Sequence, residues 1–124
     1  MSTGWKILAA DDDPTMGILL QAVFPAPHRL QYVADGLAAL AAWEASPDFD
    51  VLLLDVEMPG LDGLSLAQEL RRRHGEGLAI VLLTGREDAQ FQACCRALSA
   101  VHLAKPVNWG ELPAQIAAVL AGER

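Results

Sequence analysis

The segment Val51–Gly63 reads VLLLDVEMPGLDG, a run of apolar residues followed by an acid, a loop and a helix start. Four consecutive apolar residues are typical of a strand that is buried on both faces of a sheet. Asp55 follows this run directly, Met58 and Pro59 shape the loop, and Asp62 is suited to cap a helix. The segment therefore predicts a strand–loop–helix unit with a carboxylate at the carboxyl end of the strand.

Similar units recur along the rest of the chain. The apolar runs predict strands at Trp5–Ala10, Leu30–Ala34, Val51–Leu54, Leu78–Leu83 and Val101–Ala104. Segments of helical periodicity predict helices from Pro14 to about Phe24–Pro27, after Asp35, after Asp62, over about Glu87–Leu98 and after Asn108. Asn108 and Glu111 would form a capping box for the last helix, although Pro113 would delay its start. This alternation predicts an α/β domain in which helices cover both faces of a mostly parallel sheet.

Composition narrows the class of protein. The chain has 124 residues, 52% hydrophobic and 20% charged, which predicts one packed domain over residues 1–124, either alone or as a piece of a longer protein. The net charge of −7 argues against direct contact with nucleic acid or an anionic membrane. We expect no membrane segment, because no apolar stretch approaches the ~18 residues needed to span a bilayer. The adjacent Cys94 and Cys95 suit neither a disulfide nor a metal knuckle, which favours a cytoplasmic location.

Polar residues follow each predicted strand, where open α/β sheets bind their ligands. In chain order these are Asp11–Asp13, Asp35-Gly36, Asp55, Thr84-Gly85 and Lys105-Pro106. If the first and third strands are neighbours, Asp11, Asp12 and Asp55 converge, and a hard cation such as Mg²⁺ would relieve their repulsion. Lys105 would add a second positive charge and Thr84 a hydroxyl donor. Such a site could carry and stabilise a phosphoryl group.

Each of these residues also has an ordinary structural explanation when it is taken alone. A run of aspartates can cap a helix, and we assign that role to Asp13. An aspartate such as Asp55 commonly starts a loop, Thr84 could be a cap, and Lys105 could be a solvated surface lysine. Their joint placement at successive strand ends is what favours a functional site.

The same residues carry a family resemblance. The segment 51–63 resembles the phosphoacceptor segment of bacterial response-regulator receiver domains, with its D-x-x-M-P-x-x-D-G pattern. The opening KILAADDDP, the Thr84-Gly85 pair and the Lys105-Pro106 pair match the other three family signatures in order. The resemblance covers essentially the whole chain. It implies a flavodoxin-like, doubly wound (βα)5 three-layer sandwich with a five-stranded parallel sheet in the order 2-1-3-4-5.

The resemblance also implies roles for individual residues. Asp55 would be the phosphoacceptor, and Thr84 and Lys105 would bind the phosphoryl oxygens. Besides Asp55, the implied ligands of a bound Mg²⁺ (or Mn²⁺) are Asp12 directly, Asp11 through water and the main-chain carbonyl of Glu57. The phosphoryl group would come from the phosphohistidine of a sensor histidine kinase or a phosphotransfer protein.

The implied activity is signalling and not turnover. A receiver promotes its own phosphorylation and dephosphorylation, and it changes the face formed by the fourth helix, fifth strand and fifth helix to control a downstream protein or output domain. The alternative is a degenerate receiver that binds partners without phosphorylation. A further possible function is that of a Mg²⁺-dependent phosphatase that works through an aspartyl-phosphate, although the threonine that such an enzyme needs after Glu57 is absent. A flavin-binding protein of similar topology would need a phosphate loop where Asp11–Asp13 stand.

Four positions either differ from the usual family residue or are expected to modulate the reaction. His102 stands where the family usually has Tyr or Phe, and we expect it to keep the switch role and add a dependence on pH. Glu57 and Arg86 occupy positions that set phosphorylation and dephosphorylation rates in the family, and their opposite charges could pair across the mouth of the site. Gly85 would leave the site open to a donor. The predicted fourth helix is unusually apolar, with Phe91, Ala93, Cys94, Cys95 and Ala97. Some of these residues must pack on the sheet, and exposure of the rest would indicate a partner or homodimer contact.

Overall fold

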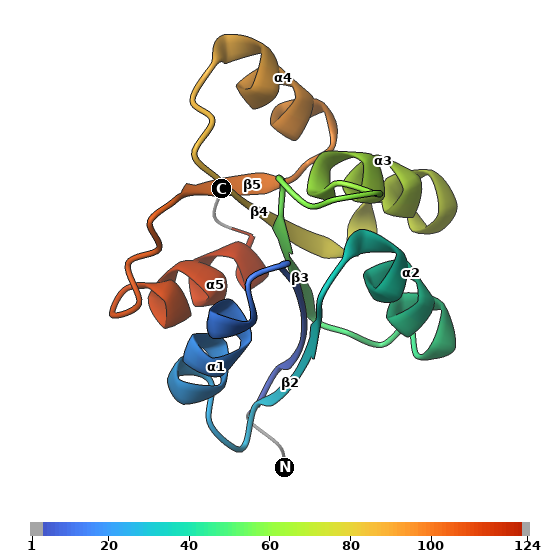
Figure 1. Cartoon of the computed structure of the whole chain (residues 1–124). Coiled ribbons are helices and arrows are strands. Elements are labelled where there is room, and N and C mark those ends of the chain that lie inside the picture. Colours follow the sequence, from blue (N-terminus) through green and yellow to red (C-terminus); the bar gives the residue numbers. More distant parts are fainter. Residues whose placement is uncertain (1–3, 123–124) are drawn as a thin grey trace.

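The structure, a computed structural model, describes residues 4–122, so both ends of the predicted domain range 1–124 lie outside the described residues. Strands and helices alternate along the chain, and the strands form one parallel sheet (Figure 1). The strands are β1 (Lys6–Ala10), β2 (Arg29–Val33), β3 (Val51–Asp55), β4 (Ala79–Thr84) and β5 (Val101–Ala104). The helices are α1 (Pro14–Val23), α2 (Gly36–Ala45), α3 (Gly63–His74), α4 (Ala89–Ala97) and α5 (Leu112–Leu120), with a short 3₁₀ turn η1 (Gly75–Gly77).

The order of the strands in the sheet is β2-β1-β3-β4-β5, which confirms the predicted topology. β1 and β3 are neighbours, and Ala10 pairs with Leu54 at their carboxyl ends. β3 continues beside β4, where Asp55 pairs with Leu83. The residues that follow β1 and β3 therefore emerge at the same edge of the sheet, where the predicted site should form.

Two apolar layers enclose the sheet, because alternate residues of each central strand point to opposite faces. On one face, Leu20 of α1 and Ile116 of α5 pack against strand residues that include Ile7, Leu53 and Val81. On the other face, Trp43 of α2, Leu66 of α3 and Phe91 of α4 pack against strand residues that include Leu8, Leu54 and Leu82. The result is the predicted three-layer sandwich (Figure 1). Both faces of β1, β3 and β4 are buried, and this explains why the sequences of these strands are almost continuously apolar.

Aspartates begin the first four α-helices. The side chains of Asp13, Asp35, Asp62 and Asp88 each accept a backbone hydrogen bond from the first turn of α1, α2, α3 and α4 respectively. The longest of the described helices is α3, with 12 residues. Within residues 4–122, no helix is both long enough and apolar enough to cross a membrane.

One predicted helix start and one predicted helix cap need correction. α4 begins at Ala89 and not at Glu87, because the Asp88 carboxylate accepts from the backbone N–H of Phe91 and sets the first turn there. α5 begins at Leu112, after a turn in which the Asn108 side chain accepts from the backbone N–H of Glu111 at 3.3 Å. The predicted capping box therefore does not start this helix, and Glu111 makes no side-chain cap bond.

Candidate functional site

Three carboxylates meet at the carboxyl edge of the sheet. Asp11 follows β1, Asp55 ends β3, and Asp12 lies beside them, so that one carboxylate oxygen from each lies within 4.8 Å of the others. The side chains of Asp11 and Asp55 are only 2% exposed, whereas Asp12 is exposed to solvent. The convergence expected from neighbouring first and third strands is therefore present, with two buried acids and one exposed acid.

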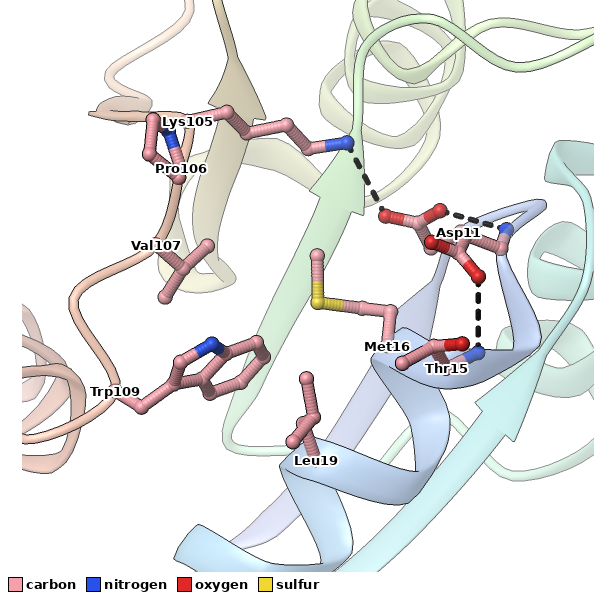
Figure 2. A pocket seen from close by; sticks show the side chains of 9 residues that line it. Asp11, Thr15, Met16, Leu19, Lys105, Pro106, Val107 and Trp109 are labelled. Carbon is pink, nitrogen blue, oxygen red and sulfur yellow. Dashed lines mark hydrogen bonds and ion pairs between the residues drawn. The ribbon is translucent and has the colours of Figure 1, made fainter.

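Lys105 reaches into this cluster from the segment after β5. Its ammonium nitrogen lies 2.8 Å from Oδ1 of Asp55 and 3.3 Å from Oδ2 of Asp11, the second contact being drawn in Figure 2. The Lys105 backbone N–H donates to the carbonyl oxygen of Thr84 at 2.9 Å, which ties this segment to the end of β4. One cation thus neutralises part of the charge of two buried carboxylates.

The proximity of these groups shifts their protonation equilibria. Burial, with a further contribution from the charge of Asp11, raises the pKa of Asp55 above its ordinary value, although Lys105 opposes this shift. Burial opposes the protonated form of Lys105, but its hydrogen bond to Asp55 and the charges of both acids raise its pKa. The site therefore carries more negative charge than the single lysine stabilises, and an added cation would be favoured.

The loop after β3 is held close to the sheet. The Val56 backbone N–H donates to Leu83 and the Val56 carbonyl accepts from the N–H of Gly63, at 3.0 and 3.1 Å. A Cβ atom on Gly63 would lie 2.3 Å from the Asp55 carbonyl oxygen, so glycine is needed where α3 begins. Met58 is buried in the core, and this anchors the loop that carries Glu57 beside the acids.

The side-chain partners of Thr84, Glu57 and Arg86 differ from those predicted. Thr84 is fully buried at the end of β4, and its hydroxyl donates to Oε1 of Glu57 at 3.0 Å. Arg86 does not pair with Glu57 as predicted. Its guanidinium pairs with Asp88 at 3.1 Å and lies over the ring of Phe91, because Asp88 is two residues away and already fixed as the α4 cap.

His102 lies on β5, opposite Leu82 in the strand register. Its imidazole is half-buried and meets the ring of Phe91 from α4 edge to face, with centroids 5.8 Å apart. In α4, Phe91 and Cys95 are buried against the sheet, while Ala93 and Ala97 are exposed. The apolar residues of this helix therefore belong mainly to the core, and only its alanines and part of Cys94 face outward.

A cavity of about 240 Å³ adjoins the acid cluster (Figure 2). It lies between α1 and the segment after β5, with Asp11 and Lys105 on its polar side. Its remaining wall is mostly apolar, with Met16 and Leu19 from α1 facing Val107 and Trp109. The site thus opens into a hollow that could accept part of a reacting partner. Gly85 also leaves open space at the end of β4, since a Cβ there would meet nothing within 4 Å.

Two features of the site were missed from the sequence. The Tyr32 hydroxyl of β2 donates to the main-chain carbonyl of Asp11 at 2.5 Å, and burial together with the nearby aspartates raises the pKa of Tyr32. The Glu57 side chain accepts a hydrogen bond from the Thr84 hydroxyl. Neither leaves a local sequence signal, because both depend on strands that are distant along the chain.

The residues present fit a hard divalent cation. The ligand atoms that they offer are carboxylate oxygens, and two of the three acids are buried where unneutralised charge is costly. Asp55 faces the Lys105 ammonium. An anionic nucleophile beside fixed positive charge is suited to take up an electrophilic phosphoryl group.

Comparison with known proteins agrees with this geometry. The family model for the response regulator receiver domain matches residues 7–117. The transcriptional regulatory protein TcrA of Mycobacterium tuberculosis is 34% identical over 94% of this chain and 46% of its own length. The sensor histidine kinase GacS of Pseudomonas protegens is 33% identical over 86% of this chain and 12% of its own. The chain therefore spans less than half the length of these curated relatives.

Solved structures show the same fold. The chemotaxis response regulator CheY4 of Vibrio cholerae has a TM-score of 0.84 and 28% identity, over 94% of this chain and 99% of that one. The beryllofluoride-activated receiver domain of DrrB has a TM-score of 0.81 at 23% identity, over 98% and 99% of the two chains, and supports the fold alone. Members of this family generally bind Mg²⁺ at an acidic pocket and act with histidine kinases and output domains. The chain belongs to the family of response regulator receiver domains of two-component systems.

Proposed function

We propose that this receiver domain accepts a phosphoryl group on Asp55 from the phosphohistidine of a histidine kinase or phosphotransfer protein, in a Mg²⁺-dependent reaction. The observation that carries the proposal is the placement of Asp55 beside Lys105 and the acids Asp11 and Asp12. Two buried carboxylates and an ammonium at one strand edge are costly to maintain without a function. We propose that residues 1–124 form this one domain.

In the proposed reaction, a carboxylate oxygen of Asp55 attacks phosphorus as the phosphorus–nitrogen bond of the donor breaks. A phosphorus–oxygen bond forms, and the electron pair of the broken bond stays on the imidazole. Lys105 and Thr84 would bind oxygens of the transferred group. Asp12, Asp11 through water, Asp55 and the Glu57 carbonyl would hold Mg²⁺ or Mn²⁺, which supplies positive charge to the phosphoryl oxygens when bound. We expect no turnover beyond this transfer and its hydrolysis.

The cavity beside the acids supports an approach for the donor. Asp11 and Lys105 line its polar side, and Leu19, which is 38% exposed, lies on its apolar side. Ile18, the next residue of α1 toward the amino terminus, is 71% exposed. We propose that the donor protein covers this apolar surface while its phosphohistidine reaches Asp55.

The signal would leave through the face formed by α4, β5 and α5, toward a downstream protein or output domain. The contact between Phe91 of α4 and His102 of β5 supports this assignment, because it joins two of these elements. Gly85 and Arg86 lie in the segment that links Thr84 to α4, where they would influence access and rate. The free, adjacent Cys94 and Cys95 support a cytoplasmic location.

The decisive experiment is incubation with Mg²⁺ and acetyl phosphate, followed by intact mass measurement of the parent and Asp55→Asn. A single phosphate adduct on the parent that is lost in the variant is expected. Sustained release of phosphate from the donor without an adduct would instead favour a phosphatase. The parent protein could instead form no adduct, consume no acetyl phosphate and take no phosphoryl group from a phosphorylated histidine kinase. That result would overturn the proposal in favour of a degenerate receiver.

A further inference from the structure

The Thr84 hydroxyl makes two hydrogen bonds within the protein. It donates to Oε1 of Glu57 at 3.0 Å and accepts from the backbone N–H of Arg86 at 2.9 Å. A hydroxyl carries one proton and can donate it to one acceptor at full strength. Thr84 is fully buried, so it has no alternative contact with solvent in this conformation. The proton that a bound phosphoryl oxygen would need is therefore already held by Glu57.

We propose that Glu57 is a positioning residue that holds the Thr84 hydroxyl away from phosphoryl binding and must release it when Asp55 is phosphorylated. The inference rests on the proposed function, in which Thr84 binds a phosphoryl oxygen. Both acceptors are anionic, so the exchange replaces one charge-assisted hydrogen bond with another. The hydrogen bond from Thr84 to the Glu57 carboxylate therefore opposes capture of the phosphoryl group. The strength of this bond sets part of the balance between the unphosphorylated and phosphorylated states of the domain.

The position of Glu57 suits this role. Its side chain is exposed, and among the described residues no basic side chain lies within ion-pair distance of its carboxylate. The predicted partner, Arg86, is held by Asp88 and by the ring of Phe91. Burial raises the pKa of Asp55, and a backbone hydrogen bond from Glu57 is among the contacts that oppose this shift. One residue thus contacts the phosphoacceptor through its main chain and Thr84 through its side chain.

Two effects of Glu57 on an incoming phosphoryl group have to be separated. The carboxylate withholds the Thr84 proton, and it also repels a second anion. Glu57→Gln removes the charge and keeps an oxygen acceptor of the same reach, whereas Glu57→Asp keeps the charge on a side chain one methylene shorter. Glu57→Ala removes both. Glu87→Ala is the matched control, because this exposed acid lies nearby and does not contact Thr84.

The test has two measurements on the whole chain. In metal-free protein, the methyl and hydroxyl resonances of Thr84 are followed by NMR. They should shift in Glu57→Ala and Glu57→Asp and stay near the parent positions in Glu57→Gln and Glu87→Ala. At saturating Mg²⁺, beryllofluoride should bind Glu57→Ala and Glu57→Asp about threefold to tenfold more tightly than the parent, the range expected for one hydrogen bond. Glu57→Gln should fall between the parent and Glu57→Ala, since its amide oxygen still accepts but makes a weaker hydrogen bond than a carboxylate.

Each alternative result overturns the inference in a recognisable way. Equal tightening in Glu57→Gln and Glu57→Ala, with Glu57→Asp at the parent value, would assign the effect to charge repulsion. Thr84 resonances that do not respond to Glu57→Ala would show that the hydroxyl is not held in solution, whatever the binding data. A parent protein that binds no beryllofluoride and takes up no phosphate would overturn the proposed function, and the release step with it. Normal phosphorylation with no difference among the Glu57 variants would overturn the inference alone.

Discussion

The ammonium nitrogen of Lys105 lies 2.8 Å from Oδ1 of Asp55, although β4 separates β5 from β3 in the sheet. The lysine therefore reaches past one whole strand to the acid at the end of another. It also lies 3.3 Å from Asp11, at the end of β1. One side chain joins the ends of three strands, so its removal should affect both the stability and the chemistry of this edge.

We expect Lys105→Ala to lower the free energy of unfolding of the metal-free protein by about 1–3 kcal/mol at pH 7, since it removes charged hydrogen bonds to two buried acids. Urea denaturation followed by tryptophan fluorescence measures this change. The double variant Asp55→Asn, Lys105→Ala should recover much of the loss, because one of the two uncompensated charges is then gone. Equal losses in the single and double variants would contradict a role for charge compensation.

The raised pKa of Asp55 has a consequence for stability. Because the folded protein holds this proton more tightly than the unfolded chain, its free energy of unfolding should fall as pH rises from the ordinary aspartate range through the raised value. Asp55→Asn lacks this penalty. In metal-free protein, the variant should therefore be more stable than the parent at pH 7, and the difference should shrink as pH falls toward 4.

Urea denaturation of the parent and Asp55→Asn at a series of pH values checks this prediction. Glu87→Gln is the control, since it makes the same change of charge at an exposed position outside the acid cluster. A stability gain of equal size at every pH would point to packing and not to ionisation. Addition of Mg²⁺ should stabilise the parent more than the variant, because the variant has lost a carboxylate ligand.

Much of this edge of the sheet could be predicted because its determinants are local. An apolar run fixes a buried strand, and an aspartate before a helix fixes its first turn, as at Asp13 and Asp62. With the strand order implied by the family resemblance, the positions of Asp11 and Asp55 follow from chain connectivity. The backbone pattern therefore determines where the acids emerge.

The partners of long polar side chains could not be predicted in the same way. Arg86 was expected to reach Glu57, but the cap at Asp88 already places a carboxylate within two residues of it. Glu57 is instead close enough to accept from Thr84. Several partners lie within reach of such flexible side chains, and only the packed backbone decides among them.

Gly63 offers a test of how tightly the site depends on its loop. A Cβ at this position would lie 2.3 Å from the Asp55 carbonyl oxygen, so Gly63→Ala must displace the backbone that carries the phosphoacceptor. We expect it to lower the free energy of unfolding by about 1–3 kcal/mol, as overpacking does elsewhere, and to weaken Mg²⁺ binding. Gly77→Ala is the control, because a Cβ there would contact nothing within 4 Å. Equal effects of the two variants would remove the steric explanation.

His102 gives the switch face a group that the usual Tyr or Phe lacks. Its ring meets Phe91 edge to face, and Phe91 lies under the guanidinium of Arg86 at 4.9 Å, so the imidazole puts an ionisable group beside this aromatic contact, where Tyr or Phe would not. We therefore expect the balance between the inactive and active states of the switch face to differ between pH 6 and pH 8 in the parent. In His102→Tyr, this balance should be the same at both pH values.

Amide NMR shifts induced by Mg²⁺ and beryllofluoride across α4, β5 and α5 report this balance for both proteins at both pH values. The parent should reach a different fraction of the shifted state at each pH, whereas His102→Tyr should reach the same fraction. If the parent and His102→Tyr responded to pH identically, the imidazole would be acting only as a packed ring on β5, and the dependence on pH would have to arise from the acid cluster.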